Sequence, residues 1–384
     1  MKVALGMIVR NLNSDLGIMN FIENAEKYGH KLDCVILAHA LKNDPVAEQN
    51  IRKKIPLHTI DISNPIYSEE QMVRRGIPEN VKRTLITCPV DTKKGLVPYG
   101  FNRTAVAIEA ILREVDVLFF TDSDIVPSVL KKTSSGSALE EIDLFGSHLA
   151  HLNSGSDATT GEYSGYNILP PAQFDHMEDL LMGVQKDSMI SYWQTSSEHK
   201  CLVHQPDEII VKPSNKVLGG NMAIKLPVFK ELPPFFSCVY TYNDEMFLCR
   251  GEDTVLGLEL QQLNFTCTDI GVYPMHDTFD SYPQQPDLQN GPKVQERLYY
   301  ALTGWVGRNP FLNHILGKDL ESKREHQRTH LEIGLDALSK YTSNPKYKTV
   351  LGNFDESWRS INRYIEEFER TYEAWRVFTE IALA

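Results

Sequence analysis

The stretch Leu118-Phe119-Phe120-Thr121-Asp122-Ser123-Asp124-Ile125-Val126 decides the fold, because an apolar run ends there in two carboxylates one residue apart. Such a run is typical of a buried strand. Since side chains alternate faces along a strand, Asp122 and Asp124 point the same way where both lie on the extended segment or its bend. Their hard oxygen atoms suit Mg²⁺ or Mn²⁺, and Mg²⁺ usually completes its shell with water and substrate phosphate. The stretch therefore predicts metal-dependent chemistry on phosphate. A surface turn after a buried strand is the alternative, since Asp and Ser are ordinary turn residues.

The segments before this stretch alternate between strand and helix patterns. The predicted elements are strands over residues 3–9, 32–38, 55–62 and 117–121, and helices over residues 17–28 and 103–114. This alternation predicts an α/β fold, with a mixed, mostly parallel sheet flanked by helices. In open α/β sheets ligands gather at the carboxyl ends of strands, which is where Asp122 and Asp124 stand.

Composition narrows the class of protein. The 384 residues, 42% hydrophobic and 23% charged, suit a globular chain with one large domain and an extension, or with two domains. No apolar run approaches the roughly 20 residues of a membrane helix, and residues 3–9 are too short for a signal-peptide core. Six scattered cysteines without CxxC spacing indicate neither a zinc site nor a disulfide framework. We therefore expect a cytoplasmic protein with reduced cysteines and no transmembrane segment.

The net charge of -12 bears on partners. It disfavours nonspecific binding to nucleic acid or anionic lipid, because such binding depends on phosphate neutralisation by Lys and Arg. An anionic ligand must then be held by a metal or by a few placed cations, such as Arg10 and Arg103.

Two further regions are patterned. Residues 153–167 are rich in Gly, Ser and Thr and contain Tyr163 and Tyr166, which predicts a long loop; an acceptor-binding loop is its functional interpretation. Residues 216–276 contain Gly219-Gly220-Asn221, then Gly251-Glu252-Asp253, then a predicted strand ending at His276.

The tail from about residue 311 is predicted to be mostly helical. Its apolar residues recur every three or four positions and are Trp358, Ile361, Ile365, Phe368, Tyr372 and Trp375. This stripe favours packing over chemistry, either against the rest of the chain or as a homodimer seam. His326 and His330 have an i,i+4 spacing that can bind metal, but a solvated helix face is favoured because no third ligand is evident.

Four elements occur in a telling order: Gly100-Phe101-Asn102-Arg103, Asp122-Ser123-Asp124, Gly219-Gly220-Asn221 and Gly251-Glu252-Asp253, closed by His276. This order resembles the nucleotide-sugar glycosyltransferases of the GT-A fold, in particular β-1,4-galactosyltransferases and chondroitin-type polymerases. The resemblance implies a catalytic domain over residues 1–310, with a nucleotide-binding half over about 1–125 and an acceptor and catalytic half over about 126–310. Residues 311–384 form a C-terminal helical extension with no counterpart.

The resemblance also implies site residues. Asp122-Ser123-Asp124 looks like the DxD motif that holds Mn²⁺ or Mg²⁺ on the donor diphosphate, with His276 as the third ligand. UDP is the expected nucleotide, and a glycan or small molecule the expected acceptor. The residues implied in nucleotide-sugar binding are Val9, Arg10, Asn11, Asn102, Arg103, Asp122, Ser123, Gly219, Gly220 and Asn221.

The expected chemistry is hydroxyl attack on the donor sugar, with inversion. A divalent cation stabilises charge on the departing diphosphate, and a carboxylate serves as general base. Asp253 is the candidate base and Glu252 the second choice. Gly219 and Gly220 let the backbone approach the donor closely, or form a tight turn. Arg103 contacts the donor diphosphate or pairs with a carboxylate, and the alternative role of His276 is to cap a strand end.

Aromatic and basic residues elsewhere are weaker candidates. Tyr166, Trp193, Trp305 and Arg308 are candidates for acceptor contact or for a lid that closes over the sugar. Core packing is the alternative for the three aromatic residues.

Two other functions stay open. Asp122-Ser123-Asp124-Ile125-Val126 also fits a haloacid-dehalogenase-type phosphatase, with Asp122 as nucleophile. A catalytically inactive sugar-nucleotide-binding protein is the second. The resemblance also has departures: no Trp-Gly precedes Gly251, and the insert between Asp124 and Gly219 is long.

Overall fold

The computed structural model describes residues 1–64, 66–92, 96–196 and 202–384. Within these residues eight strands form the main sheet: β1 (Val3–Leu12), β2 (Cys34–Asn43), β3 (Leu57–Asp61), β4 (Val117–Asp122), β7 (Ala158–Thr160), β10 (Lys212–Pro213), β11 (Asn221–Lys225) and β14 (Cys267–Asp269). Five form a second sheet: β5 (Ile125–Thr133), β6 (Gly136–Glu141), β8 (Ser164–Tyr166), β9 (Leu202–Val203) and β15 (Pro274–Asp277). β12 (Val239–Tyr242) and β13 (Glu245–Leu248) make a separate hairpin.

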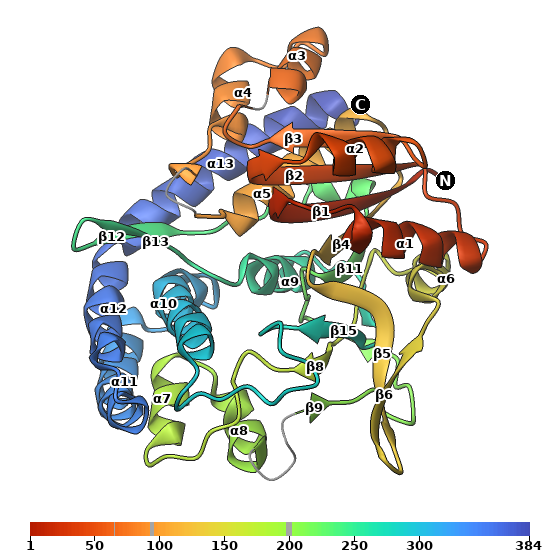
Figure 1. The fold of residues 1–384 in the computed structure, drawn as a ribbon. Coiled ribbons are helices and arrows are strands. Elements are labelled where there is room, and N and C mark those ends of the chain that lie inside the picture. The colour runs from red at the N-terminus through yellow and green to blue at the C-terminus, as the bar shows by residue number, and fades with distance from the viewer. Residues whose placement is uncertain (65, 93–95, 197–201) are drawn as a thin grey trace.

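Helices cover the sheets and fill the C-terminal part (Figure 1). They are α1 (Leu16–Lys27), α2 (Pro45–Arg52), α3 (Ile66–Arg74), α4 (Glu79–Ile86), α5 (Tyr99–Leu112), α6 (Leu144–Asn153), α7 (Met177–Gly183), α8 (Ile190–Ser196), α9 (Glu252–Gln262), α10 (Pro292–Ile315), α11 (Leu320–Thr342), α12 (Thr349–Arg359) and α13 (Ile361–Ala382). Short 3₁₀ turns are η2 (Asp187–Met189), η3 (Leu226–Lys230) and η4 (Pro345–Lys348).

The main sheet has the order β10-β14-β7-β11-β4-β1-β2-β3. β1 lies between β2 and β4 and is parallel to both, and β2 is parallel to β3. β11 then runs antiparallel to β4. The strands β1 and β4 are almost wholly buried, because α5 packs closely on one face; a Cβ on Gly6 would lie 2.7 Å from Val106 Cγ1. The expected mixed α/β sheet flanked by helices is therefore confirmed.

The paired aspartates stand where the chain leaves one sheet and enters the other. β4 ends at Asp122 in the main sheet, and β5 begins at Ile125 in the second sheet. β5 pairs antiparallel with β15, in a register that sets Ile125 opposite His276. Strand pairing alone therefore brings the late histidine to the early acidic motif.

The C-terminal helices pack on their own chain. α13 runs back across the molecule beside α4, so the C-terminus lies near the β1–β3 part of the sheet (Figure 1). The Trp375 indole N–H donates to the carbonyls of Phe229 at 3.1 Å and Leu232 at 3.0 Å, and Phe368 packs on Phe236. The predicted apolar stripe is thus an intramolecular contact over much of its length.

Some expectations about the elements were wrong. Residues 153–167 are not one long loop, because they contain the buried strands β7 and β8. The helical region begins at Pro292, earlier than predicted, and the expected boundary at residues 310 and 311 falls inside α10.

Of the cysteines, Cys201 lies outside the described residues and the five described ones are free thiols. None of the described helices is both long and apolar enough to cross a bilayer.

Candidate active site

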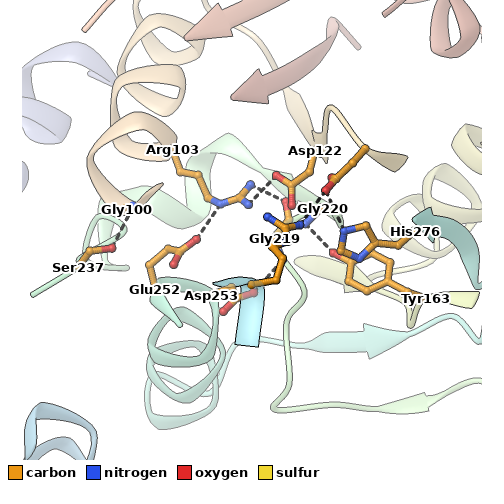
Figure 2. A network of polar contacts seen from close by, with 12 residues as sticks. Gly100, Arg103, Asp122, Tyr163, Gly219, Gly220, Ser237, Glu252, Asp253 and His276 are labelled. Carbon is orange, nitrogen blue, oxygen red and sulfur yellow. Dashed lines mark hydrogen bonds and ion pairs between the residues drawn. The ribbon is translucent and has the colours of Figure 1, made fainter. Parts of the chain in front are cut away.

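Arg103 joins three segments at the carboxyl edge of the main sheet (Figure 2). It lies on α5 with 3% of its surface exposed. Its guanidinium donates to Asp122 Oδ1 at 2.9 Å, to Glu252 Oε1 at 3.1 Å and to the Gly219 carbonyl at 2.5 Å. Burial lowers the pKa of Arg103, but the charges of Asp122 and Glu252 outweigh it and raise the pKa above its ordinary value. Arg103 is therefore a fully paired, permanently charged cation.

Glu252 is one of the hydrogen-bond partners of Arg103. It stands in the first turn of α9 and is buried, with 7% of its surface exposed. Burial and the negative charge of Asp253 raise its pKa, while Arg103 opposes that rise. Its carboxylate is engaged by the Arg103 cation, whereas Asp253 accepts hydrogen bonds from neutral donors, the Gly219 N–H at 3.1 Å and the Thr254 N–H at 2.7 Å.

Asp124 and His276 meet at the junction of the two sheets. Asp124 Oδ2 lies 3.2 Å from His276 Nε2 and 3.4 Å from Arg297 Nη2. Burial favours a raised pKa for Asp124, but the hydrogen bond and charge of His276, together with Arg297, hold its pKa below the usual range. The Tyr163 ring packs edge-on against His276 with centroids 4.9 Å apart.

The expected set of three metal ligands is not formed. Asp122 turns its Oδ1 to Arg103, and only Asp124 and His276 face each other. In the described ranges no three or more His, Cys, Asp or Glu side chains are grouped so that they could hold a metal ion. One carboxylate and one imidazole still suit Mn²⁺, provided that substrate phosphate and water complete the shell.

The two glycines before β11 are constrained by the protein itself. A Cβ on Gly219 would lie 2.5 Å from Arg103 Cζ, and one on Gly220 would lie 2.7 Å from Asp122 Oδ2. The Gly219 N–H donates to Asp253 Oδ2 at 3.1 Å, and the Gly220 N–H donates to Tyr163 Oη at 2.9 Å. Glycine is therefore required here for close approach to Arg103 and Asp122, and the turn fixes the position of Asp253.

The remaining nucleotide-site candidates differ in placement. Arg10 is exposed beside a shift in the β1–β2 register, and Asn11 is partly exposed, both at the carboxyl end of β1. Asn102 is fully buried, and neither atom of its amide has a hydrogen-bond partner in the described chain. Val9 is buried and Ser123 is exposed next to Asp122.

Asn221 has a structural use that the sequence did not reveal. Its amide donates to the carbonyls of Glu162 at 2.9 Å and Val272 at 3.0 Å, and its oxygen lies 3.0 Å from His148 Nε2. Burial lowers the pKa of His148 to about 4, so this imidazole is neutral near pH 7. Asn221 therefore fastens β11 to the segments beside it.

The aromatic candidates for a lid or acceptor contact are packing residues. Trp193 is 0% exposed and donates to the Pro170 carbonyl at 2.8 Å. Tyr166 is 4% exposed and donates to the Pro283 carbonyl at 3.3 Å. Trp305 is 6% exposed in the middle of α10, not in a loop that could close. A lid role for these three is wrong, because their rings have no free face.

The two helical histidines lie on α11, away from this site. Their rings contact each other with centroids 4.6 Å apart, and His330 Nδ1 lies 2.6 Å from Asp179 Oδ1. They form no metal cluster within the described residues.

Sequence reasoning missed Tyr163, Lys186 and Arg297 as site residues. Tyr163 was noticed only as part of a Gly-rich and Ser-rich tract. Arg297 lies on α10 and contacts Asp124. Lys186 contacts Trp305, which also lies on α10. No local pattern marks them, because folding alone brings α10 to the sheet edge.

Comparisons with known proteins give a weak likeness. No family model matches the chain, and neither does any curated protein. Among solved structures the chain is similar to glucosyl-3-phosphoglycerate synthase from Mycobacterium tuberculosis in complex with Mn²⁺, UDP and glucosyl-3-phosphoglycerate. That match has 12% identity and a TM-score of 0.40, and covers 83% of this chain and 81% of that chain. A second structure, described as a mycobacterial protein, has 11% identity and a TM-score of 0.40, with coverage of 83% and 76%. Likeness at this level assigns no family.

Proposed function

We propose that the chain is a metal-dependent glycosyltransferase of the GT-A type. It transfers a sugar from a nucleoside diphosphate donor, a UDP-sugar, to an acceptor hydroxyl, with inversion at the anomeric carbon. The proposal is carried by one observation, the meeting of Asp124 and His276 at 3.2 Å where β4 ends. Asp253 is held at the same edge through Gly219 (Figure 2).

The strand order supports this proposal. The parallel strands β3, β2, β1 and β4 bring their carboxyl ends to one edge of the sheet, which is where open α/β sheets bind ligands. Arg10, Asp122 and Asp124 stand at that edge. A donor with its phosphates near Asp124 would lie along the ends of these strands.

Each residue of the site has a role that follows from its contacts. Asp124 and His276 would hold the divalent cation, which when bound stabilises charge on the departing diphosphate. Arg297, 3.4 Å from Asp124, can turn toward a phosphate oxygen once that carboxylate is engaged. Asp253 accepts the proton of the attacking hydroxyl, and Arg103 fixes Asp122 and Glu252 around it.

The phosphatase alternative has less support. A nucleophilic aspartate needs a carboxylate oxygen free to attack phosphorus. Asp122 Oδ1 accepts a charged hydrogen bond from Arg103, and its Oδ2 lies against Gly220. Phosphate release from simple phosphomonoesters without any sugar transfer would restore that alternative.

A thermal-shift screen of nucleotide sugars with and without Mn²⁺ tests the donor assignment. A ligand that binds only the folded state raises the Tm, so the donor should raise it more when Mn²⁺ is present. Transfer with that donor should then cease in EDTA and return with Mn²⁺. Full activity in the chelator would contradict the metal assignment.

Two substitutions test the residues. Asp124→Asn should abolish the Mn²⁺-dependent Tm shift, whereas Asp116→Asn, just before the opposite end of β4, should leave it unchanged. Asp253→Asn should retain donor binding and reduce transfer about a hundredfold or more, the scale of a lost general base. Wild-type transfer by Asp253→Asn would move the base to Glu252.

A further inference from the structure

Two cations lie beside Asp253 without a carboxylate partner among the described residues, the buried Arg308 and the partly exposed Lys186. Arg308 is 4% exposed, and its one hydrogen bond to a side chain goes to the neighbouring Asn309 oxygen at 3.2 Å. Its Nε is buried and has no hydrogen-bond partner in the described part of the chain. The Lys186 ammonium lies 5.0 Å from the centre of the Trp305 ring. Within the described residues neither cation forms a salt bridge.

Close packing fixes Arg308 at the start of α9. A Cβ on Gly304 would lie 2.3 Å from Arg250 Cγ, and the Arg250 N–H donates to the Gly304 carbonyl at 3.1 Å. A Cβ on Gly251 would lie 2.7 Å from Arg308 Nη1. The middle of α10 therefore presses Arg308 against the Gly251 backbone, two residues before Asp253.

In the protein without ligand, the positive charges of Lys186 and Arg308 are energetically unfavourable. Burial, together with the charge of Arg308, lowers the pKa of Lys186 to about 7. Burial lowers the pKa of Arg308 to about 10, although Asp253 opposes that shift. Lys216 and Arg250 add further positive charge around Lys186, and Asp253 is the negative group that faces it. An uncompensated buried charge is costly, so this arrangement is one that an anion would relieve.

We propose that Lys186 and Arg308 form the subsite that binds an anionic group, a carboxylate or a phosphate, of the acceptor. The inference rests on the proposed glycosyl transfer, because it assigns Asp253 to the acceptor hydroxyl. A small acceptor with an anion and a hydroxyl on neighbouring carbons would place its anion on the two cations and its hydroxyl at Asp253. The Arg308 Nε, which has no hydrogen-bond partner among the described residues, can donate a charge-assisted hydrogen bond to that anion beside the Lys186 ammonium.

Three probes that share one skeleton test the subsite: glycerol, glycerol 3-phosphate and D-glycerate. Without donor, either anionic probe or both should raise the Tm of the wild-type protein in a saturable way, and glycerol should not. The stronger of the two anions identifies phosphate or carboxylate as the preferred group. Lys186→Met should weaken that binding roughly tenfold or more. Lys318→Met, an exposed lysine between α10 and α11, should bind like wild type.

Binding should also depend on pH in one direction. Because the pKa of Lys186 in the protein without ligand is about 7, the ammonium loses its proton as the pH rises from 7 to 9. Anion affinity should fall over that range in the wild type and stay nearly constant in Lys186→Met. Equal responses of the two proteins to pH would overturn the assignment.

The remaining outcomes separate this inference from the proposed function. Equal Tm shifts by glycerol and the anions, or an unchanged shift in Lys186→Met, would refute the subsite. Loss of the shift when UDP and Mn²⁺ are present would also refute it, because the cations would then belong to the donor diphosphate. Anion binding through Lys186, with no sugar transfer from any donor, would refute the proposed function and leave an anion site in place.

Discussion

Arg103 and Arg308 are two buried arginines at the same edge of the sheet, and they have opposite surroundings. Arg103 has two carboxylates and a carbonyl as partners, which raise its pKa above the ordinary value. Arg308 has no carboxylate partner among the described residues, and burial lowers its pKa to about 10. The difference shows that the charge of Arg103 holds the site together, whereas Arg308 keeps hydrogen-bond donors that a ligand can use.

Arg103→Met gives the largest expected effect on stability. Removing Arg103 leaves Glu252 and Asp122 as like charges near each other, without their cation. Breaking a buried ion pair in this way costs about 3–5 kcal/mol of unfolding free energy. Urea unfolding followed by circular dichroism measures the loss. A loss below about 1 kcal/mol would mean that Arg103 does not hold the site together.

Lys186→Met should have an effect that changes with pH. The folded-state pKa of about 7 lies below the ordinary 10.5, so the unfolded chain binds more protons between these values. Below pH 7 the folded wild type therefore carries the full free-energy cost of a desolvated, charged Lys186, and this cost disappears as the pH rises toward 10. Since one pKa unit is worth about 1.4 kcal/mol, Lys186→Met should be more stable than wild type by a few kcal/mol at pH 6. The gain should shrink toward pH 10, and a gain that is constant with pH would show that Lys186 is not desolvated.

A double-mutant cycle sharpens the account of Arg103. Arg103→Met and Glu252→Gln should be non-additive in unfolding free energy, because the two side chains are joined at 3.1 Å. The expected coupling is about 0.5–3 kcal/mol, measured from the denaturation midpoints of the four proteins. Additivity within about 0.3 kcal/mol would mean that the pair contributes no specific stabilisation.

Arg308→Met should not destabilise the protein and supplies the contrast. Replacing an unpaired buried cation by an apolar side chain of similar length is expected to be neutral or stabilising, by up to about 3 kcal/mol, because burial lowers the pKa of Arg308 to about 10. The same unfolding assay at pH 7 checks it beside Arg103→Met. A loss as large as that of Arg103→Met would erase the distinction between the two arginines.

The sequence alone determined β1, β2, β3, β4, α1 and α5, but it did not indicate α2, α3 or α4. The apolar run before Asp122, and the strand and helix patterns before it, specify a parallel sheet, because the periodicity of apolar residues is a local property of the chain. The order of the acidic and glycine motifs also placed Asp124, His276 and Asp253 in one predicted site. The meeting of Asp124 and His276 follows from the pairing of β5 with β15.

Only the tertiary structure decided which of the candidate side chains are free. It turned Asp122 and Glu252 to Arg103, buried Trp193 and Tyr166, and used Asn221 to fasten β11. It also brought α10 to the sheet edge, and with it the unpaired Arg308. The physical reason is that charge pairing and burial depend on neighbours distant in the chain. A sequence pattern records the type of each side chain but not the partner that satisfies it.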